Sequence, residues 1–436
     1  MKQKVTIETL KIQYTAFFHY IKNGVRKITS KPWKYPYPIL HILLAVFIIN
    51  KIPRASESDI WIVSVLKTTI LILAIMVAVF TFIYIIVRIG KPFKTKNVHI
   101  NLYKIGLVNR FGDIPTLVDK YKLKNSKNVF VYKFLNNGIS LIEFDKKKEH
   151  IESSLNKNVI KMKYGKNKKE ILMYAYSGNQ VEFKTIPWED KYLINDDFVI
   201  ALGESSLEQV TINLSSVPHI LLGGASGSGK SILLKVILMQ CIKKNAEIYL
   251  ADFKGGIDFP RVWHENCDII LDEGQLLITL NSITDVLEIR KKKFRENEVS
   301  KLSEYNALGN DMKHIIFACD EIAEVLDKTG VSKEQKEIIM QIESCLSIIA
   351  RQGRALGIHL ILATQRPDAN IFNGQIKSNI SYRICGRADS VLSSIILDST
   401  EASNVIPNDS QGLFLNQDNV LFQAYWFNDK QAWDRD

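Results

Sequence analysis

The longest apolar stretch of the chain covers residues 68–87 and contains no charged side chain. At a rise of 1.5 Å per residue, a helix of this length spans about 30 Å, the thickness of one hydrocarbon core. No polar stripe recurs at helical spacing within it, so a helix buried in a soluble core is the poorer interpretation. A shorter apolar stretch, 36–50, contains His41 and by itself is also typical of a signal peptide or an interfacial segment. Together they predict a transmembrane hairpin within residues 36–88, with crossings at about 36–50 and 68–87.

Between residues 97 and 195 the pattern changes to short runs of β-branched, aromatic or alternating residues. The predicted strands cover 129–134, 139–144, 159–164 and 171–176. A charged helical stretch, 145–156, interrupts these runs, and residues 165–169 have the composition of a hairpin turn. The pattern predicts a small α+β module over 97–195.

Residues 196–436 combine short apolar runs with longer helical stretches. An apolar run at 219–224 is followed by small residues and then by helical spacing from 232 to 244. Two further apolar runs, 314–319 and 357–364, have the length of buried parallel strands. This order predicts an α/β domain over 196–436 with a mainly parallel central sheet, preceded by the small module and a two-helix transmembrane anchor.

The net charge of +11 is unevenly distributed along the chain. Residues 1–96 carry +12 and residues 97–195 carry +8, whereas residues 196–436 carry −9. The overall pI is therefore no evidence for nucleic-acid binding by the last part. Basic residues in the N-terminal segment 1–35 and after residue 87 flank the hairpin on both outer sides. They predict a multi-pass protein of the cell membrane, with both termini cytoplasmic and the basic flanks in contact with anionic lipid.

The five cysteines lie far apart in the sequence, and none belongs to a CxxC pair. This spacing argues against a zinc site. It predicts reduced, mostly buried thiols in a cytosolic compartment.

Small residues separate the apolar run at 219–224 from the helical stretch after it. The segment matches GxxxxGK[ST] and lies between a predicted strand and a predicted helix, the context that this phosphate-binding motif requires. Backbone with little side chain can curl around phosphates and point N–H groups at them, and the helix N-terminus adds positive potential. We expect Lys230 to reach the β- and γ-phosphates of ATP and Ser231 to ligate Mg²⁺. The predicted nucleotide-binding residues are Gly224, Ala225, Ser226, Gly227, Ser228, Gly229, Lys230 and Ser231.

Two carboxylates follow the second of the apolar runs. We expect Asp320 to hold Mg²⁺ and Glu321 to polarise the attacking water, so the pattern predicts hydrolysis as well as binding. An acidic helix N-terminus would explain the two acids but not the buried strand before them. A third strand ends in Thr364 and Gln365, and a polar pair at the carboxyl end of a parallel strand is placed to sense the γ-phosphate.

With these motifs in order, residues 130–415 resemble the FtsK/SpoIIIE family of DNA-pumping motors. The segments that carry the resemblance are PHILLGGASGSGKS, DFKGGIDF, FACDEIAEVL and IARQGRALGIHLILATQRPDANIFNGQIKSNISYRI. The resemblance implies a RecA-like P-loop ATPase, a homohexamer around DNA, and ATP hydrolysis at the subunit interfaces. It also implies an arginine contributed in trans from a helix between the two Walker motifs. Arg290 is the candidate, and an ordinary charged helix face is the alternative interpretation.

Some features differ from the chromosome-translocating members. The chain ends at Asp436, which leaves no room for their C-terminal DNA-reading domain, and two crossings are predicted without a long Pro/Gln-rich linker. This short architecture resembles the TcpA-like coupling proteins of conjugative elements in Gram-positive bacteria. The resemblance implies a membrane-anchored DNA translocase that links a relaxase-bound DNA, the relaxosome, to conjugative channel proteins. Contacts in a ring pore would go mainly to DNA phosphates, with Lys254, Arg366 and Lys377 as candidates.

Other functions stay open on the sequence alone. A type VII-like protein-export ATPase shares the motor fold and a membrane anchor, although such chains usually join several motor domains and this one has a single P-loop motif. A chromosome segregation translocase would require the missing reader domain. A nucleotide-gated scaffold without motor activity would require Glu321 to be dispensable.

Overall fold

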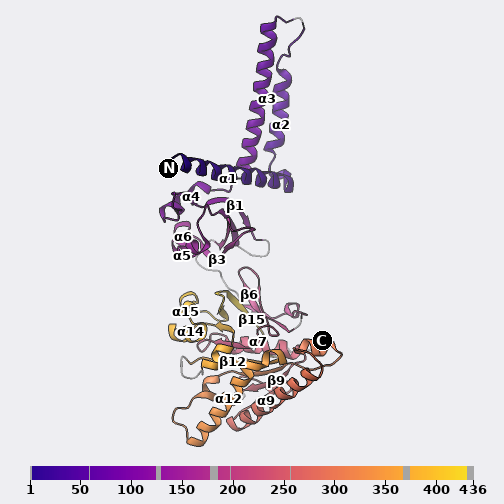
Figure 1. Cartoon of the computed structure of the whole chain (residues 1–436), viewed down its shortest axis with the longest axis vertical. Coiled ribbons are helices and arrows are strands. Elements are labelled where there is room, and N and C mark those ends of the chain that lie inside the picture. The colour runs from indigo at the N-terminus through magenta and orange to yellow at the C-terminus, as the bar shows by residue number, and fades with distance from the viewer. Residues whose placement is uncertain are drawn as a thin grey trace. The chain divides into compact units, whose positions relative to one another are not determined.

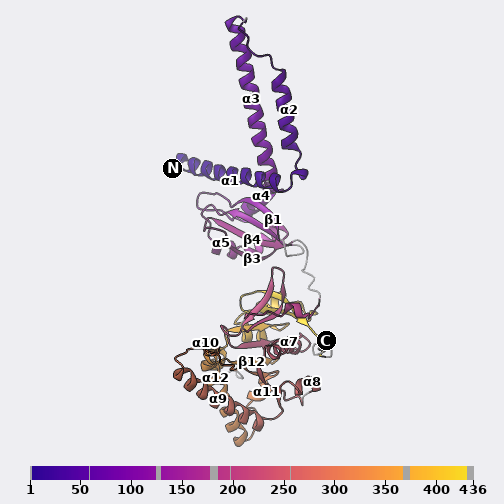
Figure 2. The same cartoon turned by 90° about the vertical axis from the view of Figure 1, so that its right-hand side faces the viewer.

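The computed structural model describes residues 2–57, 59–123, 129–176, 185–196, 198–255, 257–366 and 374–429. The chain forms two compact units, Met1–Val181 and Glu182–Asp436. Figures 1 and 2 show their elements from two directions. The helices and strands of the first unit are α1 (Lys2–Ser30), α2 (Tyr37–Lys51), α3 (Trp61–Gly90), α4 (Thr95–Lys104), β1 (Thr116–Lys122), β2 (Val129–Leu135), α5 (Leu141–Lys146), α6 (Lys148–Leu155), β3 (Asn158–Tyr164) and β4 (Glu170–Tyr176).

Helix α3 contains the apolar run 68–87 and is 30 residues long. Within the described residues it alone is long and apolar enough to cross a membrane, and only 6% of its most apolar window is buried in the protein. Helix α2 runs beside it but has only 15 residues, about 22 Å, so the second crossing stays a prediction. The Nε2 of His41 on α2 lies 3.0 Å from the carbonyl of Ala78 on α3, which gives the polar ring a partner within the hairpin.

The small module after α3 contains an antiparallel four-stranded sheet in the order β1-β2-β4-β3. Strands β2, β3 and β4 confirm three of the predicted strands, and the predicted turn at 165–169 joins β3 to β4. The strand predicted at 139–144 is wrong, because α5 begins there. Ser140 accepts a hydrogen bond from the Glu143 backbone N–H, and the Glu143 carboxylate accepts one from the Ser140 N–H, which favours a helix start.

The second unit is built on a mixed sheet that has eleven strands among the described residues. The six strands β10-β9-β11-β12-β8-β13 pair in parallel, whereas β13-β14-β15-β6-β7 pair antiparallel. The prediction of a mainly parallel sheet therefore describes only part of it. Short connections such as those of β6 to β7 and β14 to β15 allow antiparallel pairing without a crossover helix.

From β8 to β14 the strands of this unit are separated by helices, whereas β6, β7 and β8 follow one another without a helix, as do β14 and β15. Strand β5 pairs with β15, which places the residues after 182 in this unit and not in the small module. The bounds are β5 (Ile186–Pro187), β6 (Val199–Ser205), β7 (Gln209–Asn213), β8 (Ile220–Gly223), α7 (Lys230–Lys243), β9 (Glu247–Ala251), α8 (Arg261–His264), β10 (Asp268–Ile270), α9 (Glu273–Glu296), α10 (Leu302–Ala307), β11 (Ile315–Cys319), α11 (Ile322–Leu326), α12 (Lys333–Leu356), β12 (Ile358–Thr364), α13 (Gly374–Asn379), β13 (Tyr382–Cys385), α14 (Ser390–Leu397), α15 (Glu401–Val405), β14 (Leu413–Asn416) and β15 (Leu421–Trp426).

Helices cover both faces of the sheet, and successive residues of β8 show the division. Ile220 and Leu222 pack in the core that contains α7, whereas Leu221 packs in the core that contains α9 and α12. All three side chains are fully buried because the strand has a helical layer on each side. Because successive side chains of β8 point into two different apolar cores, consecutive residues of this strand are all apolar.

His219, His314 and His359 cluster where β8, β11 and β12 begin, at the sheet edge opposite the phosphate-binding motif; His219 and His359 are buried and His314 is half-buried. His314 Nδ1 and His359 Nε2 lie 2.8 Å apart, and the ring of Phe198 stacks on His314 with centroids 3.8 Å apart. Burial lowers the pKa of His219 to about 4, and burial together with Arg290 lowers the pKa of His314 to about 4. These rings are therefore neutral in the folded protein at pH 7.

This cluster should make the second unit less stable in mild acid. Between pH 6.5 and 4 the unfolded chain protonates histidines that stay neutral in the fold, so the free energy of unfolding should fall by about 1 kcal/mol per pH unit for each ring. Denaturant unfolding at pH 7.5 and 5.5 measures the loss. The exposed His264, changed in His264→Gln, is the control that should leave the pH profile unchanged. An unfolding free energy that is equal at the two pH values would contradict the expectation.

Candidate functional site

Residues 224–229 form the turn between β8 and α7, and Lys230 and Ser231 are the first two residues of α7. Gly227 and Gly229 have φ of 73° and 96°, in the left-handed region that glycine adopts without a Cβ clash. A Cβ on Gly229 would lie 2.9 Å from the backbone nitrogen of Gly412. Both small residues are thus required by the backbone geometry of the loop.

Replacing Gly229 with alanine should therefore lower nucleotide affinity by an order of magnitude or more. The new Cβ meets backbone that cannot rotate away, so the loop must shift from its phosphate-binding shape. Titration with a fluorescent ATP analogue measures the loss. Gly309→Ala is the matched control, because Gly309 also has a left-handed φ, 92°, but open space around its Cβ position. Its cost should be limited to about 1 kcal/mol of stability with unchanged affinity, and equal affinities for both variants would contradict this expectation.

Two segments far along the chain hold the loop in place. The Ala225 N–H donates to the carbonyl of Arg387 (2.7 Å), and the Gly412 N–H donates to the carbonyl of Ser228 (2.8 Å). The Arg387 guanidinium donates to the carbonyl of Ser226 (2.6 Å). The sequence did not indicate this role of Arg387, because no motif in the residues around it distinguishes it from an ordinary surface arginine.

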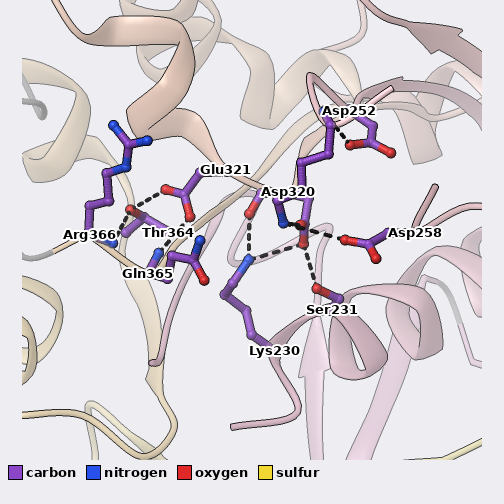
Figure 3. Close-up of polar contacts among 10 residues, drawn as sticks. Lys230, Ser231, Asp252, Asp258, Asp320, Glu321, Thr364, Gln365 and Arg366 are labelled. Carbon is purple, nitrogen blue, oxygen red and sulfur yellow. Dashed lines mark hydrogen bonds and ion pairs between the residues drawn. The ribbon is translucent and has the colours of Figure 1, made fainter. Parts of the chain in front are cut away.

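Asp320 is the centre of the polar contacts, directly after β11 (Figure 3). The Lys230 ammonium lies 2.5 Å from its carbonyl and 3.0 Å from its Oδ1, and the Ser231 hydroxyl donates to the same Oδ1 at 3.0 Å. Asp320 is 1% exposed. Burial acts to raise its pKa, but Lys230 and Lys254 outweigh burial and the pKa is lowered, so Asp320 is an anion at pH 7.

Lys254 contributes a second ammonium group to Asp320. Its Nζ lies 2.8 Å from Asp320 Oδ2 and 3.4 Å from Asp258. Burial acts to lower the pKa of Lys254, but the two carboxylates outweigh it and raise the pKa. This placement differs from the DNA contact expected for Lys254, because its side chain is directed into the site and neutralises Asp320.

Glu321 is held at its two oxygens by the end of β12. The Thr364 hydroxyl donates to Oε1 at 2.7 Å, and the Gln365 backbone N–H donates to Oε2 at 2.9 Å (Figure 3). Glu321 is buried, and β11 and β12 are adjacent and parallel, so their carboxyl ends bring the acid and the polar pair together. The two hydrogen bonds fix the direction of the carboxylate, which a residue that orients water requires.

The oxygen atoms beside the loop suit Mg²⁺. Ser231 Oγ and Asp320 Oδ1 lie 3.0 Å apart, and Mg²⁺ prefers hard oxygen ligands, of which proteins often supply only one or two beside phosphates and water. Asp252 follows β9, next to β11, and its Oδ2 is buried without a hydrogen-bond partner. Burial raises the pKa of Asp252, and the neighbouring Asp320 raises it further. A cation with its water shell would give Asp252 Oδ2 a hydrogen-bond partner and would offset the burial and the charge repulsion that raise the pKa of Asp252.

A cavity of about 580 Å³ opens over the loop. This volume lies in the range of small-molecule sites. The cavity is lined by phosphate-loop residues together with Lys254, Asp258 and Gln365, and by Thr185, Ile232, Gln411, Gly412, Gln423, Ala424, Tyr425 and Trp426. Its charged lining residues are Lys230, Lys254 and Asp258, and its aromatic ones, Tyr425 and Trp426, lie on β15.

Arg290 does not lie near this cavity. It is 5% exposed, and its guanidinium donates to the carbonyls of Leu356 (2.5 Å) and Lys313 (2.7 Å), just before β12 and β11 begin. Burial lowers its pKa to about 10. These contacts give Arg290 a structural role at the opposite sheet edge, and an arginine that reaches another subunit would have to break them.

The other two basic residues considered for DNA contact are paired with acids. Arg366 lies 3.6 Å from Glu324 and 3.7 Å from Asp327, at partly exposed positions. Lys377 lies 2.7 Å from Asp398. Exposed pairs of this kind are weak and break at little cost, so these contacts leave Arg366 and Lys377 available to phosphates.

Comparison with known proteins identifies the family. The family model described as FtsK/SpoIIIE family matches residues 194–342. The DNA translocase FtsK of Chlorobaculum tepidum is 30% identical over 230 residues, 48% of this chain and 27% of the relative. The DNA translocase SftA of Bacillus subtilis is 29% identical over 220 residues, 47% of this chain and 22% of the relative. A solved structure of the pCW3 conjugation coupling protein TcpA, a monomer form with ATPγS, has 32% identity and a TM-score of 0.58, covering 77% of this chain and 96% of that one. The chain belongs to the FtsK/SpoIIIE family.

Membership in the FtsK/SpoIIIE family confirms the resemblance that the motifs indicate. The second unit is accordingly an α/β P-loop ATPase domain of this family, and the matched residues contain the phosphate loop and both carboxylates of the site. The chain spans about a quarter of the length of the curated FtsK and SftA relatives.

Proposed function

We propose that this FtsK/SpoIIIE-family chain is a membrane-anchored, ATP-driven DNA translocase that serves as the coupling protein of a conjugative transfer system. The observation that carries the proposal is the match to the pCW3 conjugation coupling protein TcpA, at 32% identity over 96% of that chain. The curated relatives named DNA translocase support DNA as the substrate. The apolar α3 supports the membrane anchor.

Each residue of the site has a separate task in ATP hydrolysis. The loop N–H groups and Lys230 would neutralise the phosphates, and Ser231 with Asp320 would hold Mg²⁺. The magnesium ion supplies charge neutralisation at the phosphates when it is bound. Glu321, fixed by Thr364 and Gln365, would orient and polarise the attacking water. Because Thr364 and Gln365 also border the loop through β12 and β8, loss of the γ-phosphate could be transmitted along these strands.

The proposed assembly is a homohexamer around DNA, as the family resemblance implies. We propose that α2 and α3 both cross the membrane and that both termini are cytoplasmic, because basic residues flank the hairpin on its outer sides and residues 51–59 balance two basic against two acidic residues. The relaxosome and the channel proteins are the proposed partners. DNA contacts would be mainly to phosphates, with Arg366 and Lys377 as candidates, so binding should weaken steeply with salt.

The proposal is tested with the full-length protein in lipid nanodiscs. ATP hydrolysis is measured without nucleic acid, with duplex DNA, with single-stranded DNA of equal length, and with a secreted peptide. We expect stimulation by DNA, and we expect Lys230→Ala to remove hydrolysis in every condition. In donor cells, the same variant should abolish transfer of the element.

The four assay conditions and the transfer measurement distinguish the coupling protein from the other candidate functions. Hydrolysis that ignores DNA but responds to the secreted peptide would support a protein-export ATPase and overturn the proposal. DNA-stimulated hydrolysis with unaffected transfer in Lys230→Ala donors would retain the motor and exclude the coupling role. The preferred DNA form, single or double strand, follows from the same measurement.

A further inference from the structure

Helix α1 carries an apolar stripe that the other described parts of the protein leave largely exposed. Its aromatic and aliphatic residues recur at spacings of three and four, which places them on one side of a helix with 3.6 residues per turn. Ile21 and Ile28 on this side are half-buried. The exposed fractions of the others are Tyr14 65%, Phe17 38%, Phe18 64% and Val25 45%.

A different side of α1 packs on the small module. The Tyr20 hydroxyl donates to the carbonyl of Leu117, and the Asn23 amide donates to the carbonyl of Val118, both at 2.9 Å. Thr15 lines a cavity with loops of this module. By the helical period, the apolar stripe is roughly a third of a turn away from the Tyr20 side. The packing on β1 therefore leaves the stripe uncovered.

Close backbone contacts tie α1 to the end of α3. A Cβ on Gly90 would lie 1.8 Å from the carbonyl oxygen of Tyr20, and a Cβ on Gly24 would lie 2.2 Å from that of Ile86. The Lys27 ammonium donates to the Ile89 carbonyl at 3.0 Å. In both views α1 runs crosswise to α3, at the end where α3 meets the small module (Figures 1 and 2). The depth of α1 is thus set by where α3 leaves the hydrocarbon.

Charge and aromatic residues at this level match a lipid surface. Residues 1–34 carry eight Lys/Arg and one acidic residue, and of the basic residues Arg26 pairs with Asp119 and Lys27 donates to the Ile89 carbonyl. Arg88 lies in the last turn of α3, and Lys91 and Lys94 follow. Trp33, in the turn before α2, and Tyr37, the first residue of α2, are exposed, as is typical of aromatic residues at a membrane–water interface.

We propose that α1 lies in the headgroup region of the leaflet at the Arg88 end of α3, with the apolar stripe inserted to the acyl boundary and the basic side chains on anionic lipid. This inference rests on the membrane anchor of the proposed function. An amphipathic helix with lysines on its polar side binds such a surface through buried apolar area and attraction to anionic headgroups. The rigid crossing at Gly24 and Gly90 then holds the small module at a defined distance from the bilayer.

The depth of α1 can be measured in the full chain. Phe17→Cys places a thiol on the stripe, and Thr15→Cys, two residues away, places one on the side of the small module. The five native cysteines are buried, so an environment-sensitive fluorophore should label the introduced thiol selectively. In nanodiscs with one-third anionic lipid and spin-labelled lipid, we expect the Phe17→Cys label to be quenched at least about twofold more than the Thr15→Cys label, with quenching strongest by a shallow spin label.

Additional measurements distinguish the interfacial position of α1 from the membrane anchoring by α3 and from other partners of the stripe. Ile75→Cys, on the exposed surface of α3, reports the anchor and should be quenched by a deep spin label. If Ile75→Cys is quenched and the two α1 labels behave alike, α1 is not at the interface and only this inference falls. If Ile75→Cys is not quenched, the anchor falls as well. Equal quenching of the Phe17→Cys label in purely zwitterionic nanodiscs would overturn the assignment to anionic lipid.

Two other occupants of the stripe have distinct signatures. A second copy of the chain would give disulfide-linked dimers through Phe17→Cys, without quenching by lipid. Duplex DNA would change the fluorescence of the Phe17→Cys label when added, again without quenching by lipid. Either result would overturn the proposed position of α1. If the protein does not hydrolyse ATP, only the proposed motor function is contradicted, and the position of α1 is not.

Discussion

Changing Glu321 to glutamine should lower ATP turnover by a factor of roughly 10²–10⁴ while nucleotide binding is kept, since this is the usual contribution of a positioned general base. Glutamine has the same size, but its neutral amide cannot attract a proton from water. It also offers one acceptor oxygen to the two donors, Thr364 and Gln365, that now hold both carboxylate oxygens. Phosphate release at saturating magnesium and ATP measures turnover, and equilibrium titration measures binding.

Glu324→Gln is the control for Glu321→Gln. Glu324 is in the first turn of α11 and lies 3.6 Å from Arg366, so the variant removes one carboxylate from the same region without affecting the two hydrogen bonds of Glu321. Its turnover should stay close to that of the unchanged protein. A Glu321→Gln protein that hydrolyses ATP at a normal rate would exclude Glu321 as the residue that activates water and would favour a scaffold without motor activity.

Changing Asp320 to asparagine should affect both stability and magnesium-dependent binding. The variant leaves the buried Lys230 without its charged partner, and breaking one side of a buried ion pair costs roughly 3 kcal/mol or more. It also removes the charge that we expect to hold Mg²⁺. Denaturant unfolding without nucleotide measures the first effect. Titration of ATP with and without magnesium measures the second, and the gain from magnesium should disappear.

Asp258→Asn is the matched control for Asp320→Asn. Asp258 also pairs with Lys254, at 3.4 Å, but it is partly exposed, and such pairs contribute about 0.5 kcal/mol or less. Its stability and its response to magnesium should be nearly unchanged. If Asp320→Asn kept both its unfolding free energy and its magnesium response, the polar cluster around Asp320 would have neither of the roles assigned to it.

The elements around the site could be predicted because each has a strong local pattern. Strand β8, the loop at 224–229 and helix α7 follow from one apolar run, one glycine-rich turn and one helical spacing. Strands β11 and β12 follow from predominantly apolar runs that are buried on both faces. Parallel neighbours end at the same edge, so Asp320, Glu321 and Thr364 could be expected near the loop.

Other parts could not be predicted because longer-range or competing local interactions decide them. The helix at Leu141–Lys146 begins because Ser140 and Glu143 cap it, although the segment has β-like residues. The sequence made Lys254 a candidate for contact with DNA phosphates, whereas the pairing of β9 with β11 brings its ammonium 2.8 Å from Asp320. Arg290 lies in a charged run, yet α9 packs so that its guanidinium meets two carbonyls at the start of β11 and β12.

The amino-acid sequence by itself determines the phosphate loop, the two carboxylates after a buried strand, and a helix apolar enough for a bilayer, because each depends on side-chain types a few residues apart. The tertiary structure alone decides which cations neutralise Asp320, where Arg290 lies, and how an antiparallel half extends the parallel sheet. It also decides which side of α1 is left uncovered. These features depend on contacts between segments tens to hundreds of residues apart, and no local spacing encodes which of the many possible partners meet in the folded chain.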